Sequence, residues 1–338
     1  MSNPFKHNGE MLPVASINSV YVDDTKAYDL FRPTLIMEEL LRHKDQLGIT
    51  SMDQKSSLLA LFQELLSDES LSIRQTARTI AESFGHRLAR VLSTLFAPSE
   101  LSKRNRVNWT EEHWAYWSTI RQVYLVGGLT SPLLTKIFYH AIEQEFLARG
   151  IKNVKIVFVT DSQNMGTSGM GSLAPNEEIL LFDFGQTNIK RAYLVKEKGD
   201  SVIDQTLEPL LSKHLFYKTA TQEELRDTAN LLDDYMVSII EHTATEVDFK
   251  GSVICVSVAN YVSQGRIYEA RGGYGKLAYI ADNYQLHLEQ RLTQLFGRPI
   301  TIQLHHDTSA MALLYQNQPH TAVLSLGTAF GVAFTDET

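Results

Sequence analysis

The chain has 338 residues, with 31 basic and 39 acidic side chains and a formal net charge of −8. A chain of this length ordinarily forms about two domains. Its 43% hydrophobic and 21% charged residues are typical of a globular protein and exclude wholesale disorder or a fibrous repeat. The negative charge repels nucleic acid and anionic lipid, so we expect neither as a partner.

The sequence carries no targeting or membrane-spanning signal. Its beginning, MSNPFKHNGEMLPV, lacks the apolar stretch of a signal peptide. No run reaches the roughly 18 apolar residues that a membrane helix needs. We therefore expect a cytoplasmic protein. The single cysteine, Cys255, lies in the apolar run SVICVSV, so an intramolecular disulfide and a cysteine-based zinc site are excluded.

Apolar periodicity predicts helices at first and then strands that alternate with helices. Residues 34–98 read as mainly helical and end at Pro98. The later strands and hairpins are expected at 123–126, 154–160, 178–196 (a hairpin), 252–258, 299–304 and 321–335 (a hairpin). The later helices are expected at 131–149, 164–174, 221–244 and 276–296. This alternation predicts an α/β protein.

The two predicted hairpins share one layout although they lie far apart in the chain. Each has an apolar strand, a Gly near a Thr at the bend, and an apolar strand that runs back; the two segments are LLFDFGQTNIKRAYLV and AVLSLGTAFGVAFT. Such bends expose backbone N–H groups and a hydroxyl, which are donors that phosphate oxygens accept. The repetition predicts two related half-structures that present one bend each to a shared ligand.

The first hairpin carries residues that suit a nucleotide phosphate. Asp183 ends its first strand and can hold a hydrated magnesium ion, Gly185 lets the backbone approach a phosphate, and Thr187 supplies a hydroxyl. Lys190 adds positive charge. The alternative is an ordinary turn built from Asp, Gly and Thr, and the matching second bend favours phosphate binding over that alternative.

Asp307 follows an apolar strand and precedes a small-residue helical stretch. Its carboxylate is therefore expected at a helix N-terminus facing the cleft, where it can accept a proton from an attacking hydroxyl; a simple helix cap is the alternative. His305 and His306 precede it. Because side chains alternate along a strand, only His305 shares the side of Asp307, which disfavours a metal site at this HHD sequence.

The pair Gly127-Gly128 joins a predicted strand to a predicted helix. It lets a nucleotide base or ribose lie close to the backbone. The alternative is a purely structural turn, since such turns are common in α/β proteins.

These motifs together resemble those of the ROK family (repressor, open reading frame, kinase) of sugar kinases, in the actin and hexokinase superfamily. DFGQT resembles the first phosphate motif D-x-G-G-T, and SLGTAFG resembles the second, L-G-T-G-I-G. LHHDTSAMALL resembles the segment E-N-D-A-N-A-A-A-L, which carries the catalytic aspartate. VYLVGGLTSPLL resembles the adenosine strand I-V-L-G-G-G-V-S, and NMGTSGMGSLA resembles the closing helix.

The resemblance implies an α/β fold of two ribonuclease-H-like lobes around a central cleft, and ATP-dependent phosphorylation of a sugar hydroxyl. It implies that Asp307 is the general base and that Asp183 binds Mg²⁺ through water. It assigns ATP contacts to Asp183, Gly185, Gln186, Thr187, Lys190, Gly327, Thr328, Gly127 and Gly128. It assigns sugar contacts to His306, Asp307 and Glu10, the last because NGEML echoes the family's G-E-I-G-H.

The order of the motifs departs from the family. Family members end with the adenosine strand and closing helix, but here that ending, at 123–174, precedes the first phosphate hairpin, at 178–196. We interpret this order as a circular permutation, which compact domains tolerate because their termini often lie close together. It predicts one lobe from residues 1–161 plus 318–338 and another from residues 162–317.

Several residues also depart from the family motifs. Gln186 and Ala329 replace glycines in the two bends, and His305 and His306 replace the Glu and Asn before the catalytic aspartate. The family's zinc-binding element is missing, so no structural zinc is expected. These changes keep open a non-catalytic protein of the same fold that binds nucleotide or sugar as a sensor, and also an unrelated α/β enzyme. The resemblance also allows a homodimer.

Overall fold

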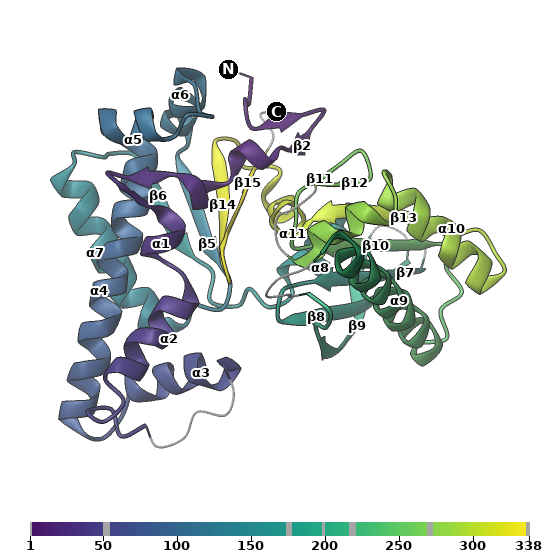
Figure 1. The fold of residues 1–338 in the computed structure, drawn as a ribbon, viewed down its shortest axis with the longest axis horizontal. Coiled ribbons are helices and arrows are strands. Elements are labelled where there is room, and N and C mark those ends of the chain that lie inside the picture. The colour runs from purple at the N-terminus through teal and green to yellow at the C-terminus, as the bar shows by residue number, and fades with distance from the viewer. Residues whose placement is uncertain are drawn as a thin grey trace.

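The computed structural model describes most of the chain and has two larger β-sheets in separate parts of the molecule (Figure 1). The described residues are 2–49, 55–173, 178–197, 200–215, 221–268 and 273–335. Residues 175–177, where we predict that the old ends of a permuted chain are joined, lie outside the described residues. Within the described residues, no helix combines the length and the apolar character needed to cross a membrane.

The first sheet has five strands in the spatial order β13-β10-β7-β8-β9. They are β7 (Glu178–Phe184), β8 (Asn188–Glu197), β9 (Asp200–Leu211), β10 (Val253–Val258) and β13 (Thr301–His306). β7, β10 and β13 are parallel, whereas β8 is antiparallel to β7 and β9. A meander with two parallel strands added beside its first strand is the topology of a ribonuclease-H-like sheet.

Helices cover both faces of this sheet. α9 (Gln222–Glu246) and α10 (Tyr284–Phe296) pack on one face, and α8 (Met165–Leu173) and α11 (Asp307–Ala312) pack on the other. β10 is therefore buried along its whole length. This is why its sequence reads as a continuous apolar run.

The second sheet has four strands in the spatial order β15-β14-β5-β6. They are β5 (Gln122–Val126), β6 (Lys155–Phe158), β14 (Thr321–Leu326) and β15 (Phe330–Phe334). β14, β5 and β6 are parallel, and β15 is antiparallel to β14. Its pattern matches that of β8-β7-β10-β13 in the first sheet, so the two sheets of this α/β protein have related topologies.

The chain order of the two sheets differs. β5 and β6 precede the hairpin β14–β15, whereas the corresponding β10 and β13 follow the hairpin β7–β8. A circular permutation accounts for the difference and stays our interpretation.

The remaining elements surround these two sheets. Two long helices, α4 (Leu71–Phe96) and α7 (Pro132–Ala148), pack together beside the second sheet (Figure 1). The other helices are α1 (Ala27–Leu30), α2 (Pro33–Arg42), α3 (Lys55–Leu65), α5 (Glu100–Asn105) and α6 (Glu111–Thr119), with 3-10 turns at Pro13–Ala15, Ile17–Ser19, Gly273–Tyr279 and Leu313–Tyr315. The short hairpins are β1 (Lys6–His7) with β2 (Glu10–Met11), β3 (Tyr21–Val22) with β4 (Thr25–Lys26), and β11 (Val262–Ser263) with β12 (Arg266–Ile267).

Aromatic packing fixes the N-terminal segment next to the C-terminal strand. The ring of Phe5 stacks on that of Phe334 with centroids 5.2 Å apart, and the Trp117 ring lies 5.0 Å from the Phe334 ring. The segment around Phe5 and strand β15 accordingly lie side by side (Figure 1). This contact also positions β2, which carries Glu10.

In the first sheet and the helices that cover it, two elements differ from the sequence-based prediction. The predicted helix at 276–296 begins only at Tyr284, because the Asn283 side chain accepts a hydrogen bond from Leu286 N at 3.0 Å and caps the helix there. Strand β9 was not predicted. It contains Pro209 and lies at the edge of the sheet, where a strand tolerates proline but has a weak sequence pattern.

Two hydrophobic cores meet where α8 and α11 cross. Met165 of α8 and Met311 of α11 belong to the core beside the second sheet, whereas Met170 and Ala310 lie in the core of the first sheet. The crossing is close, because a Cβ atom at Gly169 would lie 1.9 Å from the carbonyl oxygen of Ala310. The lobe boundaries at 161–162 and 317–318 stay a prediction, since both crossing helices contact both cores.

We expect Gly169→Ala to destabilise the protein by about 2 kcal/mol or more, because the added methyl group forces α8 away from α11. Urea denaturation followed by circular dichroism measures the loss. Gly128→Ala is the matched control, since a Cβ there meets no atom within 4 Å. Equal unfolding midpoints for Gly169→Ala and the wild type would contradict the close crossing.

Candidate functional site

A row of polar side chains crosses the first sheet near the carboxyl ends of its parallel strands. The register pairs Lys190 on β8 with Asp183 on β7, and Asp183 with Ser257 on β10. Ser257 is paired in turn with His305 on β13. Residues paired in this way project from the same face of a sheet, so the four side chains form one row.

Asp183 is held firmly within this row. Its carboxylate is buried and accepts hydrogen bonds from Ser257 Oγ at 2.8 Å and from Lys190 Nζ at 3.2 Å. Helix α8 lies against it, because a Cβ atom at Gly166 would be 3.1 Å from the Asp183 carboxyl carbon. The sequence predicted Asp183 and Lys190 in this place but not Ser257, whose only signal is a polar residue inside an apolar strand.

Asp307 is the first residue of α11, and its side chain is 22% exposed. Its Oδ1 atom accepts hydrogen bonds from Thr308 N at 2.6 Å and Thr308 Oγ1 at 3.1 Å, and lies 3.2 Å from His306 Nε2. All of these contacts end on Oδ1. Among the described residues, none donates to Oδ2, which is therefore left for another partner.

The protonation of Asp307 is set by its surroundings. Burial raises the pKa of its carboxyl group to about 7, and the negative charge of Asp183 adds to that rise. Hydrogen bonds from Thr308 and the positive charge of Lys190 act in the opposite direction. A carboxyl group with a pKa close to neutral pH is suited to accept a proton during a reaction.

His306 lies on the opposite side of β13 from His305, and its side chain is buried. Its ring stacks on that of Tyr261 with centroids 4.6 Å apart, and its Nδ1 lies 3.0 Å from Ser309 Oγ. Burial lowers its pKa to about 3, so the ring is neutral. Its Nε2 lies 3.2 Å from Asp307 Oδ1, so His306, and not His305 as side-chain alternation predicted, lies against the Asp307 carboxylate. The prediction was wrong because α11 begins at Asp307 and the alternation of the strand ends before it. The sugar contact that we predicted for His306 stays a prediction.

The first bend exposes free backbone donors. The Gly185 N–H donates within the bend, to Asn188 O at 3.2 Å and Asp183 O at 3.1 Å. The N–H groups of Gln186 and Thr187, in contrast, donate to no acceptor among the described residues. Two side chains stabilise the bend, because Ser212 Oγ and Tyr274 Oη donate hydrogen bonds to the Gly185 carbonyl oxygen at 2.7 and 3.0 Å. Neither of these two residues was predicted.

The second bend, between β14 and β15, resembles the first in this respect. Gly327 and Thr328 are exposed, and their N–H groups donate to no acceptor within the described part of the chain. The strands that carry the bend contact α11, since Ser325 Oγ lies 3.2 Å from Thr308 Oγ1. A Cβ atom at Gly331 would be 2.0 Å from the same hydroxyl, so only glycine fits there.

The Gly127-Gly128 turn lies beside the second bend. Gly127 has a φ of +110°, and a Cβ atom there would be 2.9 Å from the carbonyl oxygen of Leu326. Thr130 Oγ1 lies 2.7 Å from the carbonyl oxygens of both Gly127 and Val159, the residue after β6, and its single proton can be donated to either. Gly128 itself is exposed.

The predicted ATP and sugar positions thus form a continuous series of contacts. The Gly127 turn lies against Leu326, which precedes Gly327. Ser325 contacts Thr308, which follows Asp307. The negative charge of Asp183 in turn raises the pKa of Asp307. The structure therefore brings these segments together, although they lie far apart in the sequence. Their roles in binding and catalysis stay predictions.

Glu10 lies near this assembly on a different segment. From β2 it reaches the hairpin β11–β12, where its Oε2 atom accepts hydrogen bonds from Ser263 Oγ at 2.8 Å and Gln264 N at 2.7 Å. It therefore connects the N-terminal segment with the lobe of the first sheet.

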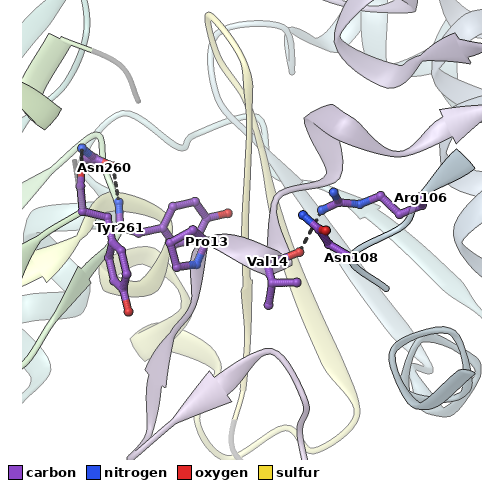
Figure 2. Close-up of a pocket in the computed structure, with 7 residues that line it drawn as sticks. Pro13, Val14, Arg106, Asn108, Asn260 and Tyr261 are labelled. Carbon is purple, nitrogen blue, oxygen red and sulfur yellow. Dashed lines mark hydrogen bonds between the residues drawn. The ribbon is translucent and has the colours of Figure 1, made fainter. Parts of the chain in front are cut away.

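A cavity of about 220 Å³ opens nearby, between the N-terminal segment and the loops that follow β10 (Figure 2). Its lining residues are Pro13, Val14, Arg106, Asn108, Asn260, Tyr261 and Tyr268. Tyr261 connects this cavity with the site, because its ring stacks on that of His306.

The comparisons with known proteins leave the family unassigned. No protein-family model matches the chain, and no curated protein matches its sequence. Among solved structures, the ethanolamine utilization protein EutJ from Carboxydothermus hydrogenoformans is similar to it at a TM-score of 0.30 and 15% identity. The match covers 57% of this chain and 63% of EutJ, less than two thirds of that protein. The fold is instead evident from sheet topology: an α/β protein with two ribonuclease-H-like sheets, as in actin-like ATPases.

The raised pKa of Asp307 predicts how its replacement affects stability. Because this pKa is higher in the folded protein than in the unfolded chain, ionisation of Asp307 destabilises the fold progressively between about pH 4 and pH 7. Asp307→Asn removes this penalty and keeps an oxygen for Thr308 N. We expect its free energy of unfolding, relative to wild type, to increase by about 2 kcal/mol between pH 5.5 and pH 8.

Urea denaturation at the two pH values measures this change. Asp161→Asn serves as the control, because Asp161 is exposed and makes no hydrogen bond within the described residues. A wild type that gains stability relative to Asp307→Asn as the pH rises would contradict the assignment of a raised pKa.

Proposed function

We propose that this protein is an ATP-dependent kinase that phosphorylates a sugar hydroxyl, with Asp307 as the general base. The observation that carries the proposal is the setting of Asp307, whose pKa is raised to about 7 by burial and by the charge of Asp183 near the first bend. Thr308 N donates to its carboxylate, and the Thr308 hydroxyl lies 3.2 Å from Ser325 in the strand before the second bend. The motif resemblance to ROK sugar kinases supplies the type of substrate. The cytoplasmic location, a homodimer, and the lack of nucleic-acid or membrane partners belong to the same proposal.

ATP is proposed to lie across the two bends. The N–H groups of Gln186 and Thr187 in the first bend, and those of Gly327 and Thr328 in the second, donate to no acceptor among the described residues and are proposed to donate to phosphate oxygens. Phosphate binding by free backbone N–H groups needs no side-chain charge. Lys190 adds one positive charge, and the Gly127-Gly128 turn is proposed to border the adenosine.

Magnesium fits this arrangement as a partner of the nucleotide. Within the described residues, no group of three or more His, Cys, Asp and Glu side chains can hold a metal ion. Mg²⁺ bound to nucleotides needs only one or two protein carboxylates and keeps several waters. Both oxygens of Asp183 already accept protein hydrogen bonds, which suits a contact with the ion through water. When bound, the ion would neutralise charge on the phosphates.

The residues of the chain then have distinct roles in the transfer. Oδ2 of Asp307 accepts the proton of the acceptor hydroxyl, while Thr308 donates hydrogen bonds to Oδ1. The acceptor oxygen forms a bond to the γ-phosphorus, and the bond from that phosphorus to the β–γ bridging oxygen breaks, which leaves ADP. Positioning and charge stabilisation supply most of the acceleration in such reactions, so the rigid bends matter as much as the base.

A sensor that binds nucleotide without catalysis is the second candidate, and Gln186 favours it. Its side chain occupies a position where the ROK phosphate motif has glycine. Its Nε2 donates a hydrogen bond to Ala259 O at 3.4 Å. Its buried Oε1 atom has no hydrogen-bond partner within the described residues. A side chain at this position changes the space open to a phosphate, which would favour binding without transfer.

We expect Asp307→Asn to lower turnover by at least about 10² while ATP affinity changes little, since it removes the base but no phosphate donor. ADP release, measured with ATP, Mg²⁺ and a panel of hexoses and N-acetylated hexosamines, tests this, with Asp161→Asn as the control. In the wild type, turnover should rise as the pH passes about 7, where Asp307 loses its proton.

Wild-type turnover by Asp307→Asn would remove Asp307 from the mechanism. ATP binding by the wild type without ADP release on any sugar would favour the sensor. No binding of any adenine nucleotide would point instead to an unrelated α/β enzyme.

A further inference from the structure

We propose that Thr308 is a positioning residue that couples the second bend to the proposed base, by passing a hydrogen bond from Ser325, in the strand before that bend, to the carboxylate of Asp307. The inference rests on the proposed kinase function and adds a form of regulation to it. The carboxylate is held in its ionised, oriented form only while the strand β14 contacts α11.

The hydrogen bonds at Thr308 form a chain with a single direction. The Thr308 hydroxyl donates to Asp307 Oδ1 at 3.1 Å. Because a hydroxyl group has one proton, it cannot also donate to Ser325 Oγ, which lies 3.2 Å away. The Ser325 hydroxyl is therefore the donor to Thr308, and its oxygen accepts in turn from Gly331 N at 3.1 Å. Hydrogen bonds that follow one another in this way strengthen each other.

The backbone of β15 covers both hydroxyl groups. The Thr308 side chain is buried. A Cβ atom at Gly331 would lie 2.0 Å from Thr308 Oγ1 and 2.4 Å from Ser325 Oγ, so the three residues are in close contact. A buried hydroxyl group that loses its partner is not compensated by bulk water, and the loss of either hydroxyl is therefore costly.

The chain of hydrogen bonds connects elements of the two sheets. Thr308 belongs to α11, which follows β13 of the first sheet, whereas Ser325 and Gly331 belong to β14 and β15 of the second. The second bend, with the free N–H groups of Gly327 and Thr328, joins those two strands. A phosphate bound at this bend holds both strands in place and so acts on the carboxylate at the other end of the chain. Such coupling has the same strength in both directions.

The Thr308 hydroxyl favours the ionised form of Asp307. A hydrogen bond donated to a carboxylate stabilises its negative charge, so this contact lowers the pKa of Asp307, whereas burial raises it. The titratable groups that act on this carboxyl group from the neighbouring elements, or on which it acts, are Asp183, Lys190, His306 and Tyr274. Among them, Lys190 acts in the same direction as Thr308.

This link is a feature of the present chain and not of the motif that it resembles. In the segment E-N-D-A-N-A-A-A-L the residue after the aspartate is Ala, whose side chain has no hydrogen-bond donor. The corresponding segment LHHDTSAMALL has Thr308 at that place. The hydroxyl therefore adds a contact that the resemblance does not imply.

The test compares Thr308→Val, Thr308→Ser and Ser325→Ala with the wild type. Valine has nearly the shape of threonine without the hydroxyl, serine keeps the hydroxyl, and Ser325→Ala removes the donor one step earlier. Thr321→Val is the matched control, because Thr321 is also a buried threonine, at the other end of β14, and its hydroxyl donates to Pro319 O at 3.3 Å.

Two measurements are made on each variant. An NMR titration of isotope-labelled aspartate carboxyl groups gives the pKa of Asp307, whose signal is identified by its loss in Asp307→Asn. ADP release with ATP, Mg²⁺ and the best acceptor among hexoses and N-acetylated hexosamines gives kcat and the KM for ATP, from about pH 5.5 to about pH 9.

We expect Thr308→Val to raise the pKa of Asp307 by about one unit, the effect of one lost hydrogen bond to a charged group. Since a larger share of the base is then protonated, kcat should fall about fivefold at pH 7 and approach the wild-type value at about pH 9, with the KM for ATP unchanged. Thr308→Ser should restore both properties, and Ser325→Ala should shift them less. A merely structural role would lower kcat equally at every pH.

The outcomes separate this inference from the proposed function. An unchanged pKa of Asp307 in Thr308→Val and Ser325→Ala overturns the link. A raised pKa together with wild-type kcat at pH 7 overturns the positioning role and leaves the kinase intact. If Thr308→Val fails to fold, Ser325→Ala decides. A wild type that phosphorylates none of the acceptors overturns the kinase proposal and its regulation, whereas the titration still decides whether the hydrogen-bond link exists.

Discussion

The close crossing of α8 and α11 is the constraint on which the rest of the site depends. No side chain fits at Gly169, where the helix meets the carbonyl oxygen of Ala310, and Gly166 lies against the carboxylate of Asp183. α11 in turn begins at Asp307 and touches Ser325 through Thr308. One tight helix contact therefore links Asp183 of β7, against which α8 lies, with Asp307 at the start of α11 and with the strand that precedes the bend of the second sheet.

This geometry stabilises the fold by tight packing, but it also destabilises it through the charge of Asp307. Asp307 lies partly buried at the start of α11, near the negative charge of Asp183, and both effects raise its pKa, so its charged form destabilises the folded protein. Hydrogen bonds to a single oxygen of Asp307 offset part of that cost and leave the other oxygen available. A protein that needed only stability would have a neutral residue there, and functional sites commonly retain such costs.

Local sequence patterns predicted most of the fold and the positions of the main motifs. Both hairpins and the strand–helix alternation are confirmed, because apolar periodicity and glycine-containing bends are local signals. The edge strand β9 and the cap at Asn283 were missed. Ser257, Ser325 and Tyr274 could not be recognised either, because their importance arises from register and packing between segments far apart in the chain. Likewise, the hydrogen-bond chain through Thr308 becomes evident only when its neighbours are placed.

The central claim is that segments around Gly127, Asp183, Asp307 and Gly327 bind one triphosphate. A crystal structure with Mg²⁺ and a non-hydrolysable ATP analogue tests it most directly. We expect phosphates between the two bends, adenosine at the Gly127 turn and the γ-phosphate facing Oδ2 of Asp307. An analogue bound on another surface, or one that contacts a single bend only, would contradict the account.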